Sequence, residues 1–300
     1  MGLITVITPT YNRAQKLRML FESLQMQTVK NFDWLIVDDG STDNTEQIVD
    51  QFKEEALFSV QYIRKDNGGK HTALNVGIQE IDTELTFIVD SDDKVMPNGT
   101  QIIEQYYEKY KNEQRIGFFS FLRCNENHQV LIKMPKDEYI GNYVRERIKG
   151  NIAGDMAEVF LTHVLRKYRF PEFTGEKFLS EDVLWIQIGM DFDTVFINES
   201  IYECEYLPGG LTKNDKSHKF ASPLGSMMRG KMLMKRACGL IINIKGAIIY
   251  NCYKCAVCAD DILDCLAITQ LREKLFIFLT KPLGLFYYMK WNKRAKQQRQ

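Results

Sequence analysis

The chain has 300 residues, 45% of them hydrophobic, which is enough to bury one large core with or without an appendage. The formal net charge is zero, so the composition does not favour a nucleic-acid partner. The charge is unevenly distributed, because residues 216–300 hold 16 Lys and Arg against 4 Asp and Glu. An acidic body followed by a basic tail predicts that the two parts meet different partners.

The sequence predicts neither a secretory leader nor a membrane-spanning helix. Residues 1–8 run directly into a strand pattern with no basic segment before it, and no run of 18 apolar residues exists. Seven Cys at low density suit a reducing compartment, so we expect a cytoplasmic protein. Four of them, Cys252 to Cys265, follow C-x2-C-x2-C-x6-C, which loosely resembles an iron–sulfur ligand run; we favour one small apolar helix face instead.

Strand and helix patterns alternate over the first 112 residues. Continuous apolar runs predict strands at 3–9, 34–37, 60–63 and 85–89. Apolar residues at helical spacing predict helices at 15–27, 43–52, 71–81 and 97–112. Asp43 and Glu46 form a capping box for the second helix, and Pro97 occupies the first position of the fourth. This alternation is typical of a parallel sheet covered on both faces.

The pattern changes after residue 112. Further strands of a mixed sheet are predicted at 116–123, 129–133, 194–198 and 201–206, with helices near 139–147 and at 181–190. From Pro223 onward only helices are predicted. The expected fold is α/β, with a domain of residues 1–222 and a basic helical region of residues 223–300. The domain would comprise a nucleotide-binding half, 1–112, and an acceptor half, 113–222.

Polar, turn-forming residues follow each of the first four predicted strands. Ligands of open parallel sheets bind beyond the carboxyl ends of the strands, so these residues predict a single crevice. The four segments are Thr8–Arg13, Asp38–Asp43, Asn67–His71 and Asp90–Asp93.

The segment Asp90-Ser91-Asp92-Asp93 carries three carboxylates in four residues. Such a group is electrostatically costly unless a cation offsets it, and hard oxygen ligands suit Mg²⁺ or Mn²⁺. Alternatively, Asp93 caps the helix that begins near Pro97. Backbone N–H groups of Gly68 and Gly69 could approach a diphosphate, as could the Lys70 ammonium, although Asn-Gly alone is an ordinary turn. Because Ser41 and Asp43 serve as helix caps, Asp38 and Asp39 are left for a ligand.

Taken together, these motifs resemble glycosyltransferase family 2, which has the GT-A fold. The resemblance covers residues 3–212. The matching segments are Val6–Arg13, Ile36–Asp43, Asn67–Asn75 and Val89–Asp93, and Gly175–Asp182 resembles the acidic catalytic segment of the family. The resemblance implies an inverting transferase that moves a sugar from a nucleotide diphosphate, usually UDP, to a hydroxyl of a saccharide or lipid-linked saccharide. Its context would be bacterial surface polysaccharide synthesis.

The resemblance also implies roles for individual residues. Asp182 would be the general base, supported by Glu181, and Asp92 would hold Mn²⁺ or Mg²⁺, with Asp93 and His218 as weaker candidate ligands. Thr8 and Tyr11 would flank the nucleobase and Asp39 would hydrogen-bond it, while Asp90 would touch the ribose. The complete donor site would comprise Thr8, Pro9, Tyr11, Arg13, Asp38, Asp39, Asn67, Gly69, Lys70, His71, Asn75, Asp90 and Ser91.

Two departures refine this expectation. Leu74 stands where many members of the family have Arg, which leaves Lys70 or His71 for the diphosphate. No Gln-x-x-Arg-Trp sequence of the processive synthases occurs, which favours addition of a single sugar.

The segment Tyr206–Lys213 resembles a mobile loop that closes over the donor. The main alternative is a non-catalytic nucleotide-sugar or polysaccharide-binding protein on the same fold, which would be expected to lack Asp92 or Asp182.

The last residues combine apolar, aromatic and basic side chains. Residues 275–289 are mostly apolar, Trp291 follows, and the cations from Lys290 to Arg299 have no acid among them. This pattern suits a helix that lies on an anionic membrane, so we expect a protein peripheral to the cytoplasmic membrane face of a bacterium. The alternative is a helix packed on the catalytic domain with a frayed basic end.

Overall fold

The structure is a computed structural model that describes residues 2–150, 152, 154–204, 215–257 and 263–298. It divides into two compact units that interleave along the sequence. The sheet unit comprises Met1–Asn142, Ile152–Arg169 and Asp191–Tyr206. The helical unit comprises Tyr143–Asn151, Phe170–Met190 and Leu207–Gln300. The division into a domain of residues 1–222 and a helical region of residues 223–300 stays a prediction.

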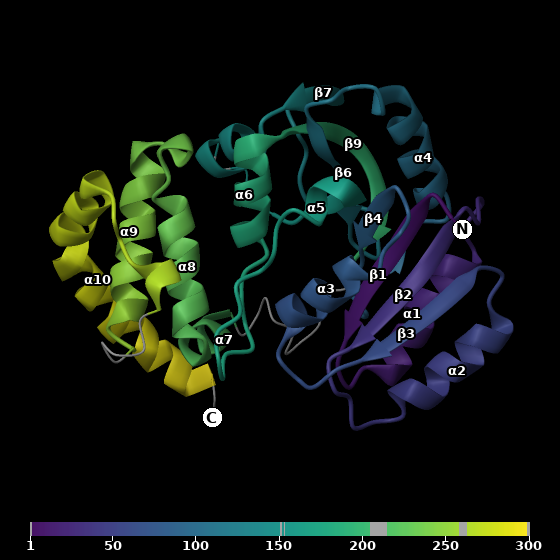
Figure 1. The fold of residues 1–300 in the computed structure, drawn as a ribbon, viewed down its shortest axis with the longest axis horizontal. Helices are drawn as coiled ribbons and strands as arrows, with labels where there is room; N and C mark the ends of the chain where they lie inside the picture. Colours follow the sequence, from purple (N-terminus) through teal and green to yellow (C-terminus); the bar gives the residue numbers. More distant parts are fainter. Residues whose placement is uncertain (1, 151, 153, 205–214, 258–262, 299–300) are drawn as a thin grey trace. The chain divides into compact units, whose positions relative to one another are not determined.

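Four parallel strands form one half of the sheet, in the order β3-β2-β1-β4 (Figure 1). They are β1 (Ile4–Thr10), β2 (Phe32–Asp38), β3 (Ser59–Arg64) and β4 (Leu85–Ile88). Ile4 pairs with Phe32 on one side and with Leu85 on the other, so the carboxyl ends of these strands lie at the same edge of the sheet. The predicted parallel α/β half is confirmed.

Helices cover both faces of this half-sheet. The core on one face contains side chains of α1 (Ala14–Gln25), α2 (Thr45–Glu55) and α4 (Gly99–Tyr110), with Val6 and Trp34 from the strands. On the other face α3 (Lys70–Gln79) lies against Ile7 and Val37, and a Cβ atom added at Gly77 would come within 2.5 Å of Ile7 Cδ1. Alternate strand residues therefore face different helices, as the pleat requires.

The other half of the sheet is mixed. Antiparallel β8 (Ala157–Leu161) joins β4 to β6 (Ile116–Cys124), and β9 (Asp193–Glu203) runs parallel to β6. Two short strands, β5 (Lys94–Val95) and β7 (Glu138–Gly141), pair antiparallel with β9. The mixed α/β architecture agrees with the GT-A fold expected from the sequence.

Several local predictions were wrong in this half. The two strands expected at 194–198 and 201–206 are the single strand β9, and the strand expected at 129–133 is one isolated bridge between Cys124 and Val130. The helix expected near 139–147 is β7 followed by a π-helix, Val144–Lys149, because residues 138–141 pair with β9. The five-residue β8 was not predicted.

Two predicted helix starts also differ. Asp43 Oδ1 accepts the N–H of Thr45 at 3.1 Å, so Asn44 is the N-cap of α2 and the predicted capping box does not form. Pro97 lies two residues before α4 rather than at its first position.

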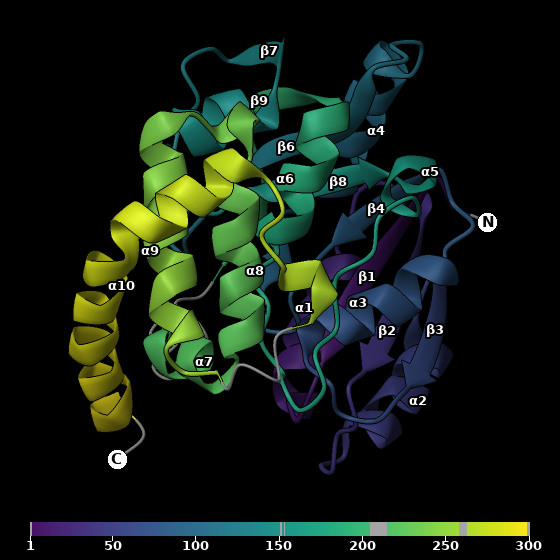
Figure 2. The ribbon, with the colours of Figure 1, turned by 60° about the vertical axis from the view of Figure 1, so that its left-hand side comes forward.

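The helical unit is built mainly of α6 (Asp182–Asp191), α7 (Asp215–Ala221), α8 (Pro223–Leu233), α9 (Leu240–Lys254) and α10 (Leu271–Gln298). Helices α8, α9 and α10 run side by side (Figure 2). Glycines let α8 approach α9 closely, since a Cβ added at Gly230 would come within 2.7 Å of Tyr250 N. None of the helices in the described part of the chain combines the length and the apolar character that a membrane span requires.

The four cysteines were predicted to share one face of a single helix, and this prediction was wrong. Cys252 belongs to α9 and is buried, whereas Cys265 lies in a separate 3₁₀ turn, Asp264–Leu266. Cys258 lies outside the described residues, as does the predicted loop 206–213.

Candidate active site

The loops that follow β1 and β2 hold each other in place. Asn12 Oδ1 accepts the N–H of Thr42 at 2.7 Å, and the N–H of Asn12 donates to Ser41 Oγ at 2.8 Å. Asp43 Oδ2 accepts the N–H of Ala14 at 3.2 Å. Asn12 has φ of 50°, a left-handed conformation that Asn tolerates better than most residues. These bonds preform the rim of the strand ends before any ligand binds.

The residues at the end of β1 divide into buried and exposed side chains. Thr8 is fully buried and its Oγ1 accepts the indole N–H of Trp34 at 3.0 Å, so its hydroxyl is engaged within the sheet, and its contact with a nucleobase stays a prediction. Pro9 is also buried. Tyr11, in contrast, is 46% exposed and is available to stack on a base.

Asp38 has a structural role, contrary to the prediction that it is left for a ligand. It is buried, Oδ1 accepts the N–H of Ser41 at 2.8 Å, and Oδ2 accepts the hydroxyl of Tyr62 at 2.6 Å. Burial, together with the bond to Asp38, raises the pKa of Tyr62, so the phenol stays protonated as a donor. Asp38 therefore holds the turn after β2 against β3.

Asp39 organises the loop between β3 and α3. Its Oδ1 accepts Lys65 Nζ at 2.8 Å and the N–H of Gly68 at 2.9 Å, while Oδ2 accepts the N–H of Gly69 at 2.6 Å. The sequence suggested that the two glycine N–H groups could approach a diphosphate. In the structure they instead donate to Asp39. Gly69 has φ of 95°, a conformation that favours glycine, and half-buried Asn67 completes this loop.

Three basic side chains surround the acidic turn Asp90–Asp93. Lys70 Nζ pairs with Asp90 Oδ1, and Arg13 Nη1 lies 2.6 Å from Asp92 Oδ1. Arg123 Nη1 lies 4.0 Å from Asp93 Oδ2. These side-chain cations offset part of the charge of the carboxylates, and the predicted binding of a divalent cation here stays a prediction. Among the described residues no group of three His, Cys, Asp or Glu side chains is placed to hold a metal ion by itself.

Tyr202, at the end of β9, ties the acidic turn together from inside. Its hydroxyl accepts the N–H of Asp90 at 2.9 Å and donates to Asp93 Oδ2 at 2.8 Å. The guanidinium of Arg123 lies over the Tyr202 ring, 4.1 Å from its centroid, and Arg123 Nε donates to Met156 O at 2.7 Å. Neither residue was predicted from the sequence, although the single Arg within the apolar run of β6 is a signal of its own.

The three carboxyls have different acidities. Burial raises the pKa of Asp93 to about 7, and the charge of Asp90 adds to this. Burial also raises the pKa of Asp92 above its usual value, against the opposing effect of Arg13. Burial acts in the same direction on Asp90, but Lys70 and Arg123 outweigh it and hold that pKa below its usual value. Asp90 is therefore the carboxylate most firmly ionised at neutral pH.

The remaining predicted donor residues are buried near these strand ends. His71 and Asn75 lie on α3, and Ser91 lies inside the acidic turn. Leu74, which replaces the Arg of many family members, is fully buried in the core.

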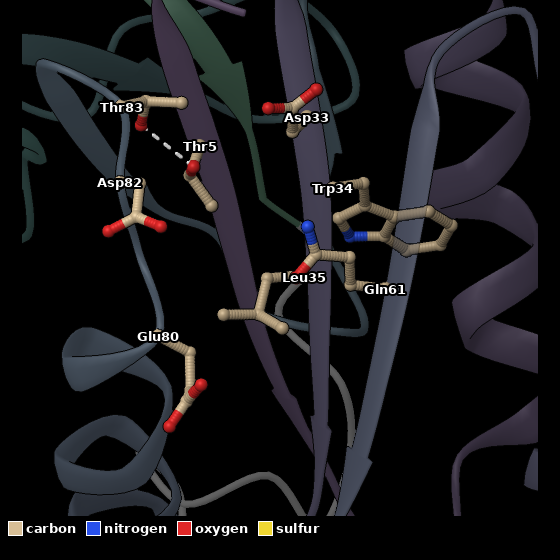
Figure 3. Close-up of a pocket in the computed structure, with 8 residues that line it drawn as sticks. All are labelled: Thr5, Asp33, Trp34, Leu35, Gln61, Glu80, Asp82 and Thr83. Carbon is tan, nitrogen blue, oxygen red and sulfur yellow. Dashed lines mark hydrogen bonds between the residues drawn. The ribbon is translucent and has the colours of Figure 1, made fainter. Parts of the chain in front are cut away.

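A pocket on the sheet unit lies elsewhere (Figure 3). Its lining consists of Thr5, Asp33, Trp34, Leu35, Gln61, Glu80, Asp82 and Thr83, and a 2.8 Å hydrogen bond joins the hydroxyls of Thr5 and Thr83. The strand residues of the pocket lie near the beginning or the middle of their strands, whereas the predicted donor residues lie near the carboxyl ends of the strands or in the segments that follow them. The pocket is therefore not the predicted donor site.

In the helical unit, the predicted general base Asp182 forms an ion pair with Arg229, which was not predicted from the sequence. Asp182 is the first residue of α6, and Arg229 Nε lies 3.0 and 2.8 Å from its two oxygens. Burial would raise the pKa of Asp182, but Arg229 outweighs it and holds the pKa below its usual value. Glu181 is half-buried just before α6. The ring of His218, on α7, stacks on Phe178 with a centroid distance of 6.2 Å.

Solved structures with this fold include nucleotide-sugar complexes. Residues 1–349 of S. aureus TarS, in complex with UDP-GlcNAc, align with a TM-score of 0.64 at 17% identity, over 99% of this chain and 92% of that one. The mannosyltransferase PcManGT of Pyrobaculum calidifontis, in complex with GDP-Man and Mn²⁺, aligns with a TM-score of 0.58 at 17% identity, over 99% and 84% of the two chains. At these identities the likeness shows the shared GT-A fold.

Sequence comparison identifies the family. The glycosyltransferase GlyG of Streptococcus pneumoniae serotype 4 is 26% identical over 253 residues, which cover 81% of this chain and 83% of GlyG. The family profile described as glycosyl transferase family 2 matches residues 5–166, more than half of the chain. The chain therefore belongs to glycosyltransferase family 2 and is a glycosyltransferase.

Proposed function

We propose that this glycosyltransferase transfers one sugar, with inversion, from a UDP-sugar to a hydroxyl of a saccharide or lipid-linked saccharide of the bacterial cell surface. The observation that carries the proposal is the acidic turn after β4, where Asp90 pairs with Lys70 and Asp92 with Arg13. Exposed Tyr11 at the end of the neighbouring strand β1 offers an aromatic surface for a base. The UDP-GlcNAc complex of TarS, on the same fold, supports a uridine nucleotide as the first donor to test.

The residues of the acidic turn fit a divalent cation that binds together with the donor. The carboxylates of Asp90, Asp92 and Asp93 face three basic side chains, so an incoming diphosphate would leave an excess of negative charge. Mg²⁺ and Mn²⁺ usually bind through one or two carboxylates together with substrate phosphates and waters. Asp92, whose side chain is 15% exposed, would be the main ligand, Asp93 a weaker one and His218 a further candidate. Such an ion would offset charge on the departing diphosphate.

Side chains of the chain would perform the remaining chemistry. Lys70 and Arg13 would supply positive charge near the diphosphate, and Asp182 would take the proton of the acceptor hydroxyl. The acceptor oxygen forms a bond to C1 of the sugar as the bond from C1 to the diphosphate oxygen breaks, and UDP leaves with the electron pair. A single displacement from the opposite face inverts the anomeric centre.

A donor panel tests this proposal. Release of nucleotide is measured with UDP-GlcNAc, other UDP-sugars and GDP-Man, in Mn²⁺, Mg²⁺ or a chelator, with and without saccharide acceptors. We expect turnover with a UDP-sugar that depends on a divalent cation and is lost in Asp182→Asn. Tight binding of UDP-sugars without turnover under any condition would instead favour a non-catalytic binding protein.

We also propose that α10 binds an anionic membrane surface. Its exposed face is apolar, formed by Leu271, Leu275, Phe278, Leu279, Leu283, Leu285, Phe286 and Met289. Its fully buried residues are instead polar or small: Glu273, Thr280, which accepts a hydrogen bond from Asn251 Nδ2 at 3.0 Å, and Gly284, which lies against Asn251. A helix that directs its apolar side chains outward has an apolar partner surface.

Charge selects a lipid surface as that partner. Five exposed cations accompany the apolar face: Lys274, Lys281, Lys290, Lys293 and Arg294. Glu273, the single acid in the α10 sequence, is buried. Each Lys or Arg near an anionic bilayer contributes about 1 kcal/mol, screened by salt.

Vesicle co-sedimentation tests this assignment. Phe278→Glu in the full-length protein should reduce binding to phosphatidylglycerol-containing vesicles, and 0.5 M salt should weaken binding of the wild type. Equal co-sedimentation of the two proteins would exclude α10 as the membrane contact, and a concentration-dependent dimer that Phe278→Glu disrupts would assign the face to a second copy of the chain.

A further inference from the structure

The predicted catalytic segment Gly175–Asp182 is attached to α8 at three points. The carboxylate of Glu176 accepts the N–H groups of Leu224 and Gly225, at 2.7 and 2.8 Å, and so caps the first turn of α8. The N–H of Phe178 donates to Ser222 Oγ at 3.1 Å. Arg229 then contacts Asp182 from the second turn of α8. One face of a single helix therefore sets the path of the segment.

The Arg229–Asp182 contact is the most directional of the three. Nε donates to Oδ1 and Oδ2 at 3.0 and 2.8 Å, and Nη2 lies 2.7 Å from Oδ2. A planar guanidinium that engages both carboxylate oxygens fixes the rotation of the carboxylate as well as its position.

We propose that Arg229 is a positioning residue for the transfer reaction, which orients the carboxylate of Asp182 and supplies its counter-charge. This inference rests on the proposed role of Asp182 as the general base. It assigns a function to α8 in the reaction. The bonds of Glu176 and Ser222 hold the segment Gly175–Asp182 at the start of this helix, and Arg229 holds the last residue of the same segment. Nothing in the local sequence around Arg229 signals this role.

The charged and titratable neighbours of Asp182 determine its pH dependence. Besides Arg229 on α8, they are Lys219 on α7, the Ser180 hydroxyl and the thiol of Cys238 in the 3₁₀ turn Arg236–Cys238. Burial raises the pKa of Cys238 to about 11, so this thiol is neutral. Arg229 is the largest influence that favours the ionised form of Asp182. Removal of its charge should therefore raise the pKa of Asp182 and move the acidic limb of the rate profile to higher pH.

Three variants of the full-length protein test the inference, with the UDP-sugar that the donor panel selects. In Arg229→Gln the acidic limb of the profile of kcat against pH should move upward, and kcat at its optimum should fall about 10²-fold, the typical effect of a misplaced catalytic group. The KM for the donor should not change. Arg229→Lys keeps the charge but cannot hold both oxygens, so the limb should stay while kcat falls. Lys231→Gln removes a cation two residues away on α8 that bonds to Cys265 O and Ala267 O, and should leave the limb unchanged.

A second readout does not depend on turnover. Carbon-13 NMR of Asp carboxyls, with the Asp182 signal assigned by its loss in Asp182→Asn, should show a higher Asp182 pKa in Arg229→Gln than in the wild type. An unchanged limb, kcat and Asp182 pKa in folded Arg229→Gln would overturn the inference. Turnover retained in Asp182→Asn would overturn the proposed base instead, so the two failures are distinguishable. If Arg229→Gln does not fold, a wild-type kcat in Arg229→Lys overturns the positioning role.

Discussion

Removal of the Tyr202 hydroxyl should both destabilise the protein and weaken donor binding. In Tyr202→Phe the N–H of Asp90 and the carboxyl of Asp93 lose their shared partner, at 2.9 and 2.8 Å, while the ring beneath Arg123 is kept. A neutral hydrogen bond contributes roughly 0.5–1.5 kcal/mol and one to a charged group roughly 1.5–3 kcal/mol. The expected loss is therefore about 2–4 kcal/mol at pH 8, where Asp93 is ionised.

The loss should be smaller at pH 6, because the pKa of Asp93 is raised to about 7 and both bonds are then neutral. Urea unfolding at the two pH values measures this difference, and titration calorimetry with UDP and Mn²⁺ should show affinity lower by about 10–100-fold, as for other groups that support a metal ligand. Tyr106→Phe is a matched control, since its hydroxyl bonds to exposed Glu199 at 2.5 Å and its loss should cost within about 0.5 kcal/mol. Equal stability and UDP affinity in Tyr202→Phe and the wild type would refute the reasoning.

Asp92→Ala should abolish the Mn²⁺-dependent part of UDP affinity without loss of fold, and calorimetry that detects unchanged affinity would exclude Asp92 as a ligand. The pKa of Asp93 in the folded protein is raised to about 7, so protonation of Asp93 stabilises the fold fully below about pH 4, and this stabilisation is lost as the pH rises through 7. In Asp93→Asn the urea midpoint should therefore no longer decrease with pH over this range. Iodoacetamide should label exposed Cys255 before buried Cys252, whose pKa is raised by burial to about 12; peptide mass mapping that finds equal rates would contradict the burial.

The first half of the sheet was predictable because local signals agree there. Val6, Trp34 and Phe87 belong to continuous apolar strands, and helices at 3.6-residue spacing separate them. The second half was not, because β8 is only five residues long and contains Glu158, and because the chain at 138–141 takes its conformation from pairing with β9. Short strands acquire their structure from neighbours that sequence patterns do not identify.

The motif residues were found from the sequence, but their roles were less predictable. Strand ends with Asp39 and Asp92 were visible as polar segments, whereas the partners of these acids come from distant positions. Lys65 lies in the loop after β3, Tyr202 in β9 and Arg229 in α8, and only the fold brings them to their carboxylates. Spacing along the chain predicts which strand end a side chain follows, and it carries no information about which oxygen is already occupied.

Proton NMR of the product tests the proposed reaction most directly. The wild-type protein is incubated with Mn²⁺, an acceptor saccharide and the UDP-α-sugar that the donor panel selects, and the anomeric configuration of the new linkage is measured. We predict a β-linked product, formed together with UDP, and no such product with Asp182→Asn. An α-linked product, or the same β-linked product at an undiminished rate with Asp182→Asn, would contradict a single inverting displacement assisted by this carboxylate.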